Sequence, residues 1–378
     1  MIQPLSGVLV LDFTTLLPGP LATLMLAEAG AEVIKIERPG GEDMRAMPPV
    51  HDGEAAVFAI LNRGKKSVVI DLKNENDRNH LRPLIEKADV LVEQFRPGVM
   101  ERLGFAFEAV KTINPRIVYC SISGYGQNGP RAGEAGHDVN YLSRTGLLAL
   151  QPGPIDRPVL PPALVADIGG GTMPAVINIL LGLRQRDATG EGVYLDIAMT
   201  DAMFTFAWFA YAVGHTTGKF PGPGELRVAG GSPRYQLYPT RDRKIVCCGA
   251  LEQKFWLSFC NTIGLAAPLM NDLADPEATK AAIADIIRRE TAEHWRPKFA
   301  AADCCVTIMA SLEDALHDPH FVERGLFAHQ VSGASGATMP ALPVPIAETL
   351  RAKPGVKPSP KLGADNDLLG QDSQADTV

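Results

Sequence analysis

The sequence predicts an α/β fold with a mostly parallel sheet, followed by a smaller α+β domain. Short apolar runs alternate with helical patterns in the N-terminal half, a stretch rich in glycine and proline follows, and two strand-like runs then precede a mainly helical region. The length of 378 residues also exceeds the size at which one hydrophobic core usually stops growing, which favours two domains.

The N-terminal segment is predicted to form a strand–helix–strand unit. Residues 7–12 (GVLVLD) are a short apolar run typical of a buried parallel strand. Pro18-Gly19-Pro20 opens a helical run that extends to about Gly30, and residues 31–37 (AEVIKIE) form the second strand. Further strands are expected at residues 67–72, 89–93, 117–121 and 193–197.

The pattern changes near residue 215. Residues 216–234 are rich in Gly and Pro and are expected to be a linker. Strand-like runs at 235–239 and 244–248 then precede helical patterns that reach about Glu323. We therefore expect a large domain at 1–215, a linker at 216–234 and a small domain at 235–325, with an extended tail from Lys353 onward.

Composition narrows the class of protein. The net charge of −7 argues against a general nucleic-acid binder. The N-terminus has neither a basic region nor a long apolar stretch, so we expect no signal peptide and a cytoplasmic protein. The apolar segment 198–213 is too short to span a membrane and is expected to be a core helix. None of the six cysteines forms a CxxC pair, so neither disulfides nor structural zinc are expected.

One glycine motif needs a test of its context. Residues 124–129 (GYGQNG) match GxGxxG after a predicted strand, but a dinucleotide fingerprint requires the third glycine to open a helix. Pro130 follows at once, and residues 131–136 have no apolar periodicity. Nicotinamide or flavin binding is therefore not predicted.

Two residues on glycine-rich turns are candidates for proton transfer. His137 follows a glycine-rich loop, and Asp167 precedes Gly169-Gly170-Gly171 and a predicted helix at 172–186. A helix N-cap is the alternative role for Asp167, and a backbone-bonded loop residue is the alternative for His137. Such turns also let a substrate approach the backbone closely, as proton transfer requires.

Several segments resemble the class III CoA-transferase family, also called CaiB/BaiF. They are GVLVLDFTTLLPGPLATLMLAEAGAEVIKIERP, NRGKKSVVIDLK, VEQFRPGVMERLG, SISGYGQNGP, GVYLDIAMTDAM, GALEQKFW and SLEDALHDPHFVERG, in the family's order over nearly the whole chain. The resemblance implies a Rossmann-like large domain completed by the C-terminal segment 326–378. It also implies a dimer of two interlocked chains, with each active site between the large domain of one and the small domain of the other.

The resemblance is to the α-methylacyl-CoA racemase branch. That branch has a His-Asp pair in a GHDxNY setting, an Asp before a glycine run and a Glu in a GALE segment, matched here by His137-Asp138, Asp167 and Glu252. The transferase branch uses the equivalent Asp as a nucleophile in a DxxTG-like setting. This chain departs from GALEPQF by reading GALEQKF, which puts the substrate preference in doubt.

The resemblance implies racemisation of 2-methyl-branched acyl-CoA thioesters, with class III CoA transfer between carboxylic acids as the alternative. His137 and Asp167 would remove and return the α-proton on opposite faces. Glu252 would orient His137, unless it is simply an exposed carboxylate. Backbone N–H groups near Asp138 or in the glycine run would stabilise the enolate oxygen.

Coenzyme A enters as part of the substrate, and no prosthetic group or metal is expected. His317 and His320 lie close in sequence, but no further ligands stand at a known metal-site spacing. The candidate CoA-binding residues lie in loops near predicted strand ends, where open sheets bind ligands. Taken singly, each charged residue among them could equally be a solvated surface group. The candidates are Arg38, Arg63, Lys65, Lys66, Arg96, Gly124 and Tyr125, with Arg38 and Arg96 foremost.

Overall fold

A computed structural model describes residues 2–153 and 156–370 of the chain, which form two compact units. The first unit comprises Met1–Arg144, Pro162–Met203 and His320–Val378, and the second comprises Thr145–Pro161 and Phe204–Pro319. The expected boundaries lie at residues 215 and 325, whereas the structure divides the chain after Met203 and Pro319. The 145–161 segment joins the second unit, where the Leu150 carbonyl accepts a hydrogen bond from the Gly224 N–H at 3.1 Å.

A six-stranded parallel sheet forms the centre of the first unit, in the order β5-β2-β1-β6-β7-β8. This confirms the predicted α/β class. The strands are β1 (Leu9–Phe13), β2 (Glu32–Glu37), β5 (Lys66–Val69), β6 (Val90–Glu93), β7 (Val118–Ser123) and β8 (Val193–Ala198). Because all strands run the same way, the loops that follow β1, β6 and β7 meet at one edge, where open sheets bind ligands.

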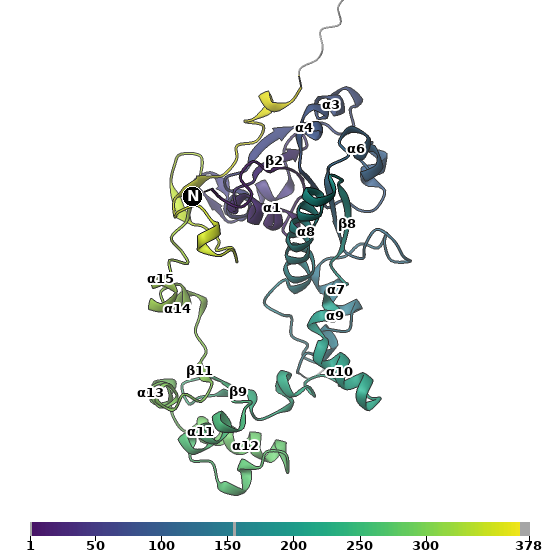
Figure 1. The fold of residues 1–378 in the computed structure, drawn as a ribbon. Helices are drawn as coiled ribbons and strands as arrows, with labels where there is room; N and C mark the ends of the chain where they lie inside the picture. The colour runs from purple at the N-terminus through teal and green to yellow at the C-terminus, as the bar shows by residue number, and fades with distance from the viewer. Residues whose placement is uncertain (1, 154–155, 371–378) are drawn as a thin grey trace, which may run out of the picture. The chain divides into compact units, whose positions relative to one another are not determined.

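Helices cover both faces of this sheet. On one face α1 (Pro18–Glu28) packs against α8 (Met173–Thr189), and Figure 1 shows these two helices lying beside each other. Every residue of α1 is buried, which explains its apolar composition. On the other face, residues of α4 (Arg82–Lys87) and α6 (Phe107–Ile113) join Leu11, Ile34 and Leu91 in one hydrophobic core.

The remaining elements of the first unit are short. They are β3 (Val50–His51), β4 (Glu54–Ala55), α2 (Ala56–Asn62), α3 (Glu75–His80), α5 (Val99–Arg102), α7 (Asp138–Arg144), α15 (Pro319–Glu323), β12 (Gln330–Ser332), β13 (Thr338–Pro340) and β14 (Val356–Pro358).

The C-terminal segment covers the edge of the sheet at β5. The Ser67 N–H donates to the Asp365 carboxylate at 2.9 Å, and the Val69 N–H donates to the Asn366 side chain at 2.7 Å. An edge strand otherwise presents unpaired backbone groups that can pair with another chain. Side chains from the tail therefore satisfy the outer edge of the sheet.

The second unit has a three-stranded antiparallel sheet in the order β11-β10-β9. Its strands are β9 (Tyr235–Pro239), β10 (Ile245–Gly249) and β11 (Val306–Ile308), and its helices include α11 (Gln253–Ile263), α12 (Pro276–Ile287), α13 (Ala292–Ala302) and α14 (Leu312–Leu316). Trp256, Phe259 and Trp295 are buried in its core. This is the smaller α+β part that the sequence predicts.

The expected core helix at residues 198–213 is wrong. β8 ends at Ala198, and two helices follow, α9 (Met203–Phe206) and α10 (Trp208–Thr217). Phe204, Phe206, Trp208 and Tyr211 on them are exposed, so the segment is apolar without being core. In the part of the chain that the structure describes, one helix, Ala166–Thr189, is long and apolar enough to cross a membrane by length and composition, and half of its apolar window is buried.

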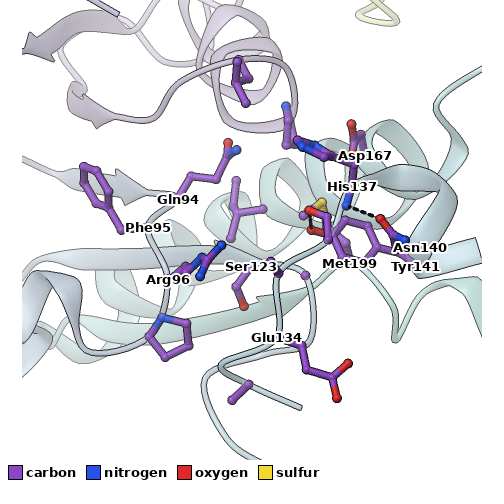
Figure 2. A pocket seen from close by; sticks show the side chains of 18 of the residues that line it. Gln94, Phe95, Arg96, Ser123, Glu134, His137, Asn140, Tyr141, Asp167 and Met199 are labelled. Atoms are coloured by element: carbon purple, nitrogen blue, oxygen red, sulfur yellow. Dashed lines mark hydrogen bonds between the residues drawn. The ribbon is translucent and has the colours of Figure 1, made fainter. Parts of the chain in front are cut away.

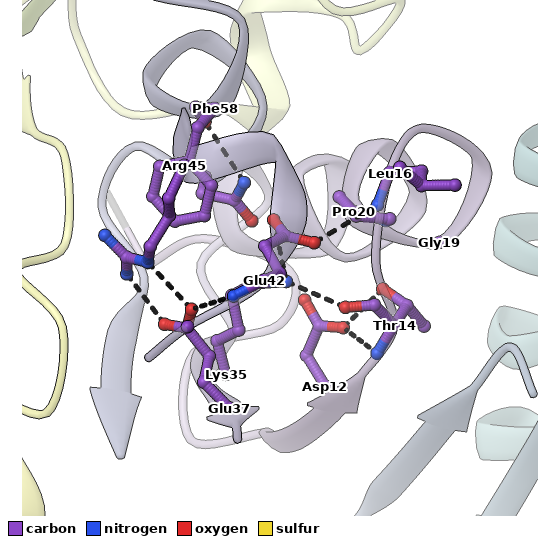
Figure 3. Close-up of polar contacts among 12 residues, drawn as sticks. Asp12, Thr14, Leu16, Gly19, Pro20, Lys35, Glu37, Glu42, Arg45 and Phe58 are labelled. Carbon is purple, nitrogen blue, oxygen red and sulfur yellow. Dashed lines mark hydrogen bonds and ion pairs between the residues drawn. The ribbon is translucent and has the colours of Figure 1, made fainter. Parts of the chain in front are cut away.

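A buried polar network lies between the ends of β1 and β2 (Figure 3). The Lys65 ammonium group donates to Asp12 at 3.0 Å, to Thr23 at 2.8 Å and to Asn62 at 2.8 Å, and neither charged side chain of the Lys65–Asp12 pair is exposed. Burial disfavours the Asp12 carboxylate, but Lys65 and Lys35 outweigh it and lower the pKa of Asp12. Lys35 also donates to the Thr14 carbonyl at 2.8 Å, so the network fixes the start of the loop that follows β1.

Replacing Lys65 tests this network. Lys65→Met should lower the free energy of unfolding by ~3–5 kcal/mol, because it leaves the Asp12 carboxylate buried without its partner. The neighbouring Lys66 forms an exposed pair with Glu32, so Lys66→Met should change the free energy by under ~1 kcal/mol. Urea unfolding followed by circular dichroism measures both, and equal effects would contradict the assignment.

Candidate active site

A cavity of about 450 Å³ lies at the carboxyl edge of the sheet in the first unit. The loops after β1, β6 and β7 contribute to it, together with the segment before α7 and the start of the Ala166–Thr172 helix (Figure 2). Its lining includes Thr15, Leu16, Pro18, Gln94, Phe95, Arg96, Ser123, Gly124, Gly136, His137, Asn140, Tyr141, Asp167 and Met199. The structure thus brings His137 and Asp167, separated by thirty positions in the chain, to one cavity.

His137 stands immediately before α7, with an exposed side chain. Its backbone N–H donates to the Asn140 side-chain oxygen at 3.0 Å, as Figure 2 shows. The Tyr141 hydroxyl donates to the Gly136 carbonyl at 2.5 Å. Asn140 and Tyr141 therefore hold the turn in place from within α7, while the imidazole faces the cavity.

Asp138 has a structural contact that the sequence does not reveal. Its side chain is buried, and one carboxylate oxygen accepts hydrogen bonds from the backbone N–H groups of Ala166 at 2.6 Å and Asp167 at 3.0 Å. The residue that follows His137 thus holds the backbone of Asp167. Because these two N–H groups are already bonded, they are not free to hold an enolate oxygen, and the expected donors near Asp138 or in the glycine run stay a prediction.

Asp167 lies in a π-helical turn, Ala166–Thr172, that runs directly into α8. Such turns are rare and occur frequently at functional sites. Burial, followed by the nearby Asp138 carboxylate, raises the pKa of Asp167 to about 6, although His137 acts in the opposite direction. The group can therefore be a carboxylate or a carboxylic acid near neutral pH. The N-cap alternative fails, because Asp167 is inside the helix and Val165 precedes its first turn.

The glycines after Asp167 allow this turn to pack closely. A Cβ atom on Gly170 would lie 2.2 Å from the Met199 carbonyl oxygen, and one on Gly171 would lie 3.0 Å from Pro18. Because neither side chain would fit without movement, the glycine run lets the π-helical turn sit against the end of β8 and the start of α1.

Glu252 belongs to the second unit, at the N-cap position of α11, and its side chain is exposed. Within the described residues it makes no capping hydrogen bond to that helix. Its expected contact with His137 stays a prediction, because the two residues lie in different units.

Two of the candidate CoA-binding residues lie beside cavities. Arg96 is exposed on the wall of the first cavity. Arg38 borders a second cavity of about 360 Å³, between the ends of β1, β2 and β5, and its guanidinium contacts Asp43 and the Gly41 carbonyl. Thr15 and Phe95 line both cavities, so the two lie on either side of these residues.

Other candidates have different surroundings. Arg63 is fully buried and bonds to Glu28 and to the Leu342 carbonyl, and Lys65 is buried in the network described above. Both side chains are engaged inside the unit, so we assign them to its stability. Lys66 pairs with Glu32 at the surface. Among residues 2–153 and 156–370, no group of three or more His, Cys, Asp or Glu side chains is placed to hold a metal ion.

Gly124 and Tyr125 follow β7, and only Gly124 lines the cavity directly. A Cβ atom on Gly124 would lie 2.5 Å from a carbon of the Tyr141 ring. Tyr125 packs edge-on against the same ring, with 5.4 Å between the ring centroids. Both residues therefore fix Tyr141. Gln94 is a cavity residue absent from the sequence candidates, and it accepts a hydrogen bond from the Gly19 N–H at 2.9 Å. Its position two residues before the candidate Arg96 is the sequence feature that could have identified it.

The geometry is that of an acid–base site at the carboxyl edge of a parallel sheet. The model of CoA-transferase family III matches residues 5–366. The chain is 34% identical to the α-methylacyl-CoA racemase of Mus musculus, over 95% of this chain and 90% of the racemase. It is 32% identical to the acetyl-CoA:oxalate CoA-transferase of Acetobacter aceti, over 98% of this chain and 96% of the transferase.

A solved structure of a CaiB/BaiF family protein from Brucella suis has a TM-score of 0.82 to this chain at 28% identity, covering 97% of this chain and 98% of that one. The chain therefore belongs to CoA-transferase family III. Its relatives include racemases and transferases, so family membership supports an enzyme that acts on CoA thioesters.

The close packing at Gly170 gives a test of the site. Gly170→Ala should displace the π-helical turn, because its Cβ meets backbone rather than a flexible side chain, and should reduce activity at least ~10-fold by moving Asp167. Gly133→Ala is the matched control, since nothing lies within 4 Å of a Cβ there and the residue stands in the loop before His137. Turnover of an acyl-CoA substrate measures both; an unimpaired Gly170→Ala enzyme would refute the packing argument.

Proposed function

We propose that the protein is an acyl-CoA racemase or epimerase that inverts the α-carbon of 2-methyl-branched acyl-CoA thioesters. The observation that carries this proposal is the pair of His137 and Asp167 in one cavity, where burial raises the pKa of Asp167 to about 6. Inversion needs two groups that each exchange a proton near neutral pH. An ordinary solvated Asp, which ionises near pH 3.9, would rarely be protonated there.

The proposed reaction is a two-base proton transfer through an enolate. The thioester acidifies its α-carbon, because removal of the proton places negative charge on the carbonyl oxygen. In one direction His137 takes the α-proton and protonated Asp167 delivers another to the opposite face. In the other direction the Asp167 carboxylate is the base and the His137 imidazolium is the acid.

Two further carboxylates would support this pair. Asp138 fixes the backbone at Asp167 through the Ala166 and Asp167 N–H groups and raises the pKa of Asp167 by its charge. Glu252 would bond the second ring nitrogen of His137 and stabilise the imidazolium. The exposed position of Glu252 at a helix N-cap, without a capping bond to α11 among the described residues, is compatible with this role.

Coenzyme A would extend across both cavities of the first unit. Arg38 would meet the phosphates at the smaller cavity, and Arg96 would meet a phosphate or the pantetheine at the larger one. The chain between them would pass Thr15 and Phe95, which line both cavities. The thioester would then reach His137 and Asp167.

CoA transfer between carboxylic acids is the second candidate. It is favoured by the resemblance to the acetyl-CoA:oxalate CoA-transferase and by the position of Asp167, a partly exposed carboxyl at the cavity wall. In that reaction the Asp167 carboxylate attacks the thioester carbonyl and the C–S bond breaks. CoA thiolate departs, and the acyl group remains on Asp167 as a mixed anhydride. Hydroxylamine would trap this anhydride during turnover, and an added acid would yield a new CoA ester; the racemase proposal expects neither.

We also propose a cytoplasmic homodimer in which Glu252 reaches the His137 of its partner. Apolar side chains support an interface. Ile177, Leu180 and Leu181 on α8 are exposed, as are Trp208 and Tyr211 on α10. On each helix these residues are three or four positions apart and share one face, and exposed apolar faces of this kind are typical of protein interfaces.

The racemase proposal predicts isotope exchange coupled to inversion. In D2O, one epimer of a 2-methylacyl-CoA should gain deuterium at the α-carbon and approach an equal mixture of epimers, with no second substrate. His137→Ala and Asp167→Asn should each reduce inversion by ~100-fold or more, the usual contribution of one acid–base group. Each variant should retain exchange only for the epimer that faces its remaining base. Chiral chromatography and mass spectrometry measure inversion and exchange.

Glu252→Gln is the graded control, because Glu252 takes no proton and its loss should reduce inversion less than the loss of either base. As the pH falls through about 6, protonation of Asp167 should reduce the exchange that uses its carboxylate as base. If His137→Ala inverted the substrate as fast as the parent enzyme, the two-base scheme would be refuted in favour of CoA transfer.

The dimer proposal predicts complementation between inactive chains. When His137→Ala and Glu252→Ala chains are refolded together, each mixed dimer should contain one site with both residues intact, so inversion should exceed that of either variant alone. Light scattering of the parent protein should give twice the 40.5 kDa chain mass. A stable, active monomer of that chain mass would contradict both parts.

A further inference from the structure

A row of polar side chains crosses three strands beneath the candidate active site. Glu93 at the end of β6 pairs in register with Ser121 on β7, and Ser121 pairs in register with Asp196 on β8. The Ser121 hydroxyl hydrogen-bonds to the Glu93 carboxyl and also receives a hydrogen bond from the Tyr194 hydroxyl at 3.3 Å. The row therefore links the carboxyl ends of neighbouring strands.

Both carboxylates of the row bind backbone where the chain leaves the sheet. Glu93 accepts a hydrogen bond from the Phe95 N–H at 2.8 Å, and Asp196 accepts one from the Gln127 N–H at 3.0 Å. Phe95 lines both cavities, and the next residue, Arg96, lines the larger one. Glu93 thus holds the segment that would meet coenzyme A, although it is not itself on the wall of either cavity.

Glu93 is buried at 4% exposure, in surroundings that oppose its charge. Burial, followed by the Asp196 charge, outweighs the bonds from Ser121 and Phe95 and raises the pKa of Glu93 to about 7. The titratable groups around it are Tyr119 and Cys120 on β7, Tyr194 and Asp196 on β8, and Glu101 and Glu108 on the adjoining cavity of about 310 Å³. None of these is a cation, so Glu93 has no ion-pair partner among them.

The raised pKa of Glu93 distinguishes a role in stabilising the fold from a role in holding the Phe95 backbone. A carboxyl whose pKa is higher in the folded protein than in the unfolded chain lowers stability as the pH rises from about 4.5 to about 7. At neutral and alkaline pH the ionised Glu93 therefore opposes folding. The presence of a carboxylate at this position is therefore not explained by a gain in stability. It is explained by the hydrogen bond from the Phe95 N–H, because a charged acceptor forms a stronger hydrogen bond than a neutral one.

We propose that Glu93 is a positioning residue for coenzyme A, whose carboxylate holds the 94–97 segment so that Phe95 and Arg96 face the ligand. The inference rests on the proposed function in that it takes the two cavities as the CoA site. Beyond that function, we infer that a residue outside the ligand site controls CoA affinity, and that this affinity depends on whether the Glu93 carboxylate is protonated. Protonation of Glu93 weakens its bond to the Phe95 N–H and reverses its bond to Ser121.

The test uses Glu93→Gln, which keeps the shape of the protonated side chain, and measures free CoA binding by calorimetry between pH 6 and pH 8.5. At pH 8.5 the variant should bind CoA about fivefold more weakly than the parent, the difference between a charged and a neutral acceptor. The difference should vanish toward pH 6, where the parent is protonated too. With acyl-CoA the KM should rise at pH 8.5 while kcat stays within about twofold.

The controls separate this inference from the others. Glu101→Gln removes an exposed carboxylate from the cavity of about 310 Å³ beside Glu93, which is not part of the proposed CoA site. It should leave CoA binding unchanged at every pH. Arg96→Ala should weaken binding of CoA at all pH values. The melting temperature of Glu93→Gln at pH 8.5 should equal or exceed that of the parent, whereas a purely structural role would lower it.

The outcomes are distinguishable. If the parent protein does not bind CoA, the proposed function fails. If the parent binds CoA and Glu93→Gln binds equally well at pH 8.5, or if the ratio of the two affinities is the same at pH 6 and pH 8.5, the inference about Glu93 is overturned while the proposed function stands. Should Glu93→Gln fail to fold, Ser121→Ala removes a hydrogen bond that lowers the pKa of Glu93, so CoA affinity should fall at a higher pH than in the parent. An unchanged pH dependence of CoA affinity in that variant would overturn the inference instead.

Discussion

The site depends on one recurrent interaction, a buried carboxylate that accepts hydrogen bonds from backbone N–H groups where the chain enters or leaves a helix or strand. Asp138 holds Ala166 and Asp167, Glu93 holds Phe95, and Asp12 holds Thr14 at 2.9 Å. Backbone donors at strand and helix ends need partners once water is excluded. A carboxylate satisfies them without filling the cavity above, and its charge also changes the pKa of neighbouring groups, as Asp138 does for Asp167.

Because several of these carboxylates bind backbone N–H groups, acidic residues can surround a site that is proposed to bind an anionic ligand. In the proposal Asp167 acts on the substrate and Glu252 acts on His137, whereas Asp138, Glu93 and Asp12 accept hydrogen bonds from backbone N–H groups. Lys35 and Lys65 compensate the buried charge near β1, so that region is neutralised from within. Arg38 and Arg96 lie at the surface instead, Arg38 beside Asp43, and in the proposal they meet the phosphates of coenzyme A.

The sequence predicts the sheet well, because buried parallel strands are continuous apolar runs with turn residues after them. The expected strand at residues 89–93 is β6, Val90–Glu93, and the expected strand at 235–239 is β9. The family motifs also identify the two residues that share the cavity, His137 and Asp167. Composition alone fails at residues 198–213, where several apolar side chains lie on exposed helices, since apolarity does not distinguish a buried helix from an exposed one.

Other features depend on contacts between distant residues, which local patterns do not encode. Arg63 has the sequence context of a loop cation, but its guanidinium lies against Glu28 and the carbonyl of Leu342. Likewise Asp138 looks like a partner of His137, and only the fold brings it under Asp167, 28–29 positions along the chain. The register of three strands, rather than any motif, places Glu93 beside Ser121 and Ser121 beside Asp196.

The tail that covers β5 has a consequence for synthesis on the ribosome. The partners of Ser67 and Val69 are Asp365 and Asn366, so roughly three hundred residues must emerge before that edge is closed. The whole second unit is translated in the interval. A parallel sheet with an open edge would then persist while translation continues, and such edges are the parts of a nascent chain most prone to aggregation. The order of the chain therefore places the residues that close the β5 edge about three hundred positions after the strand that they cover.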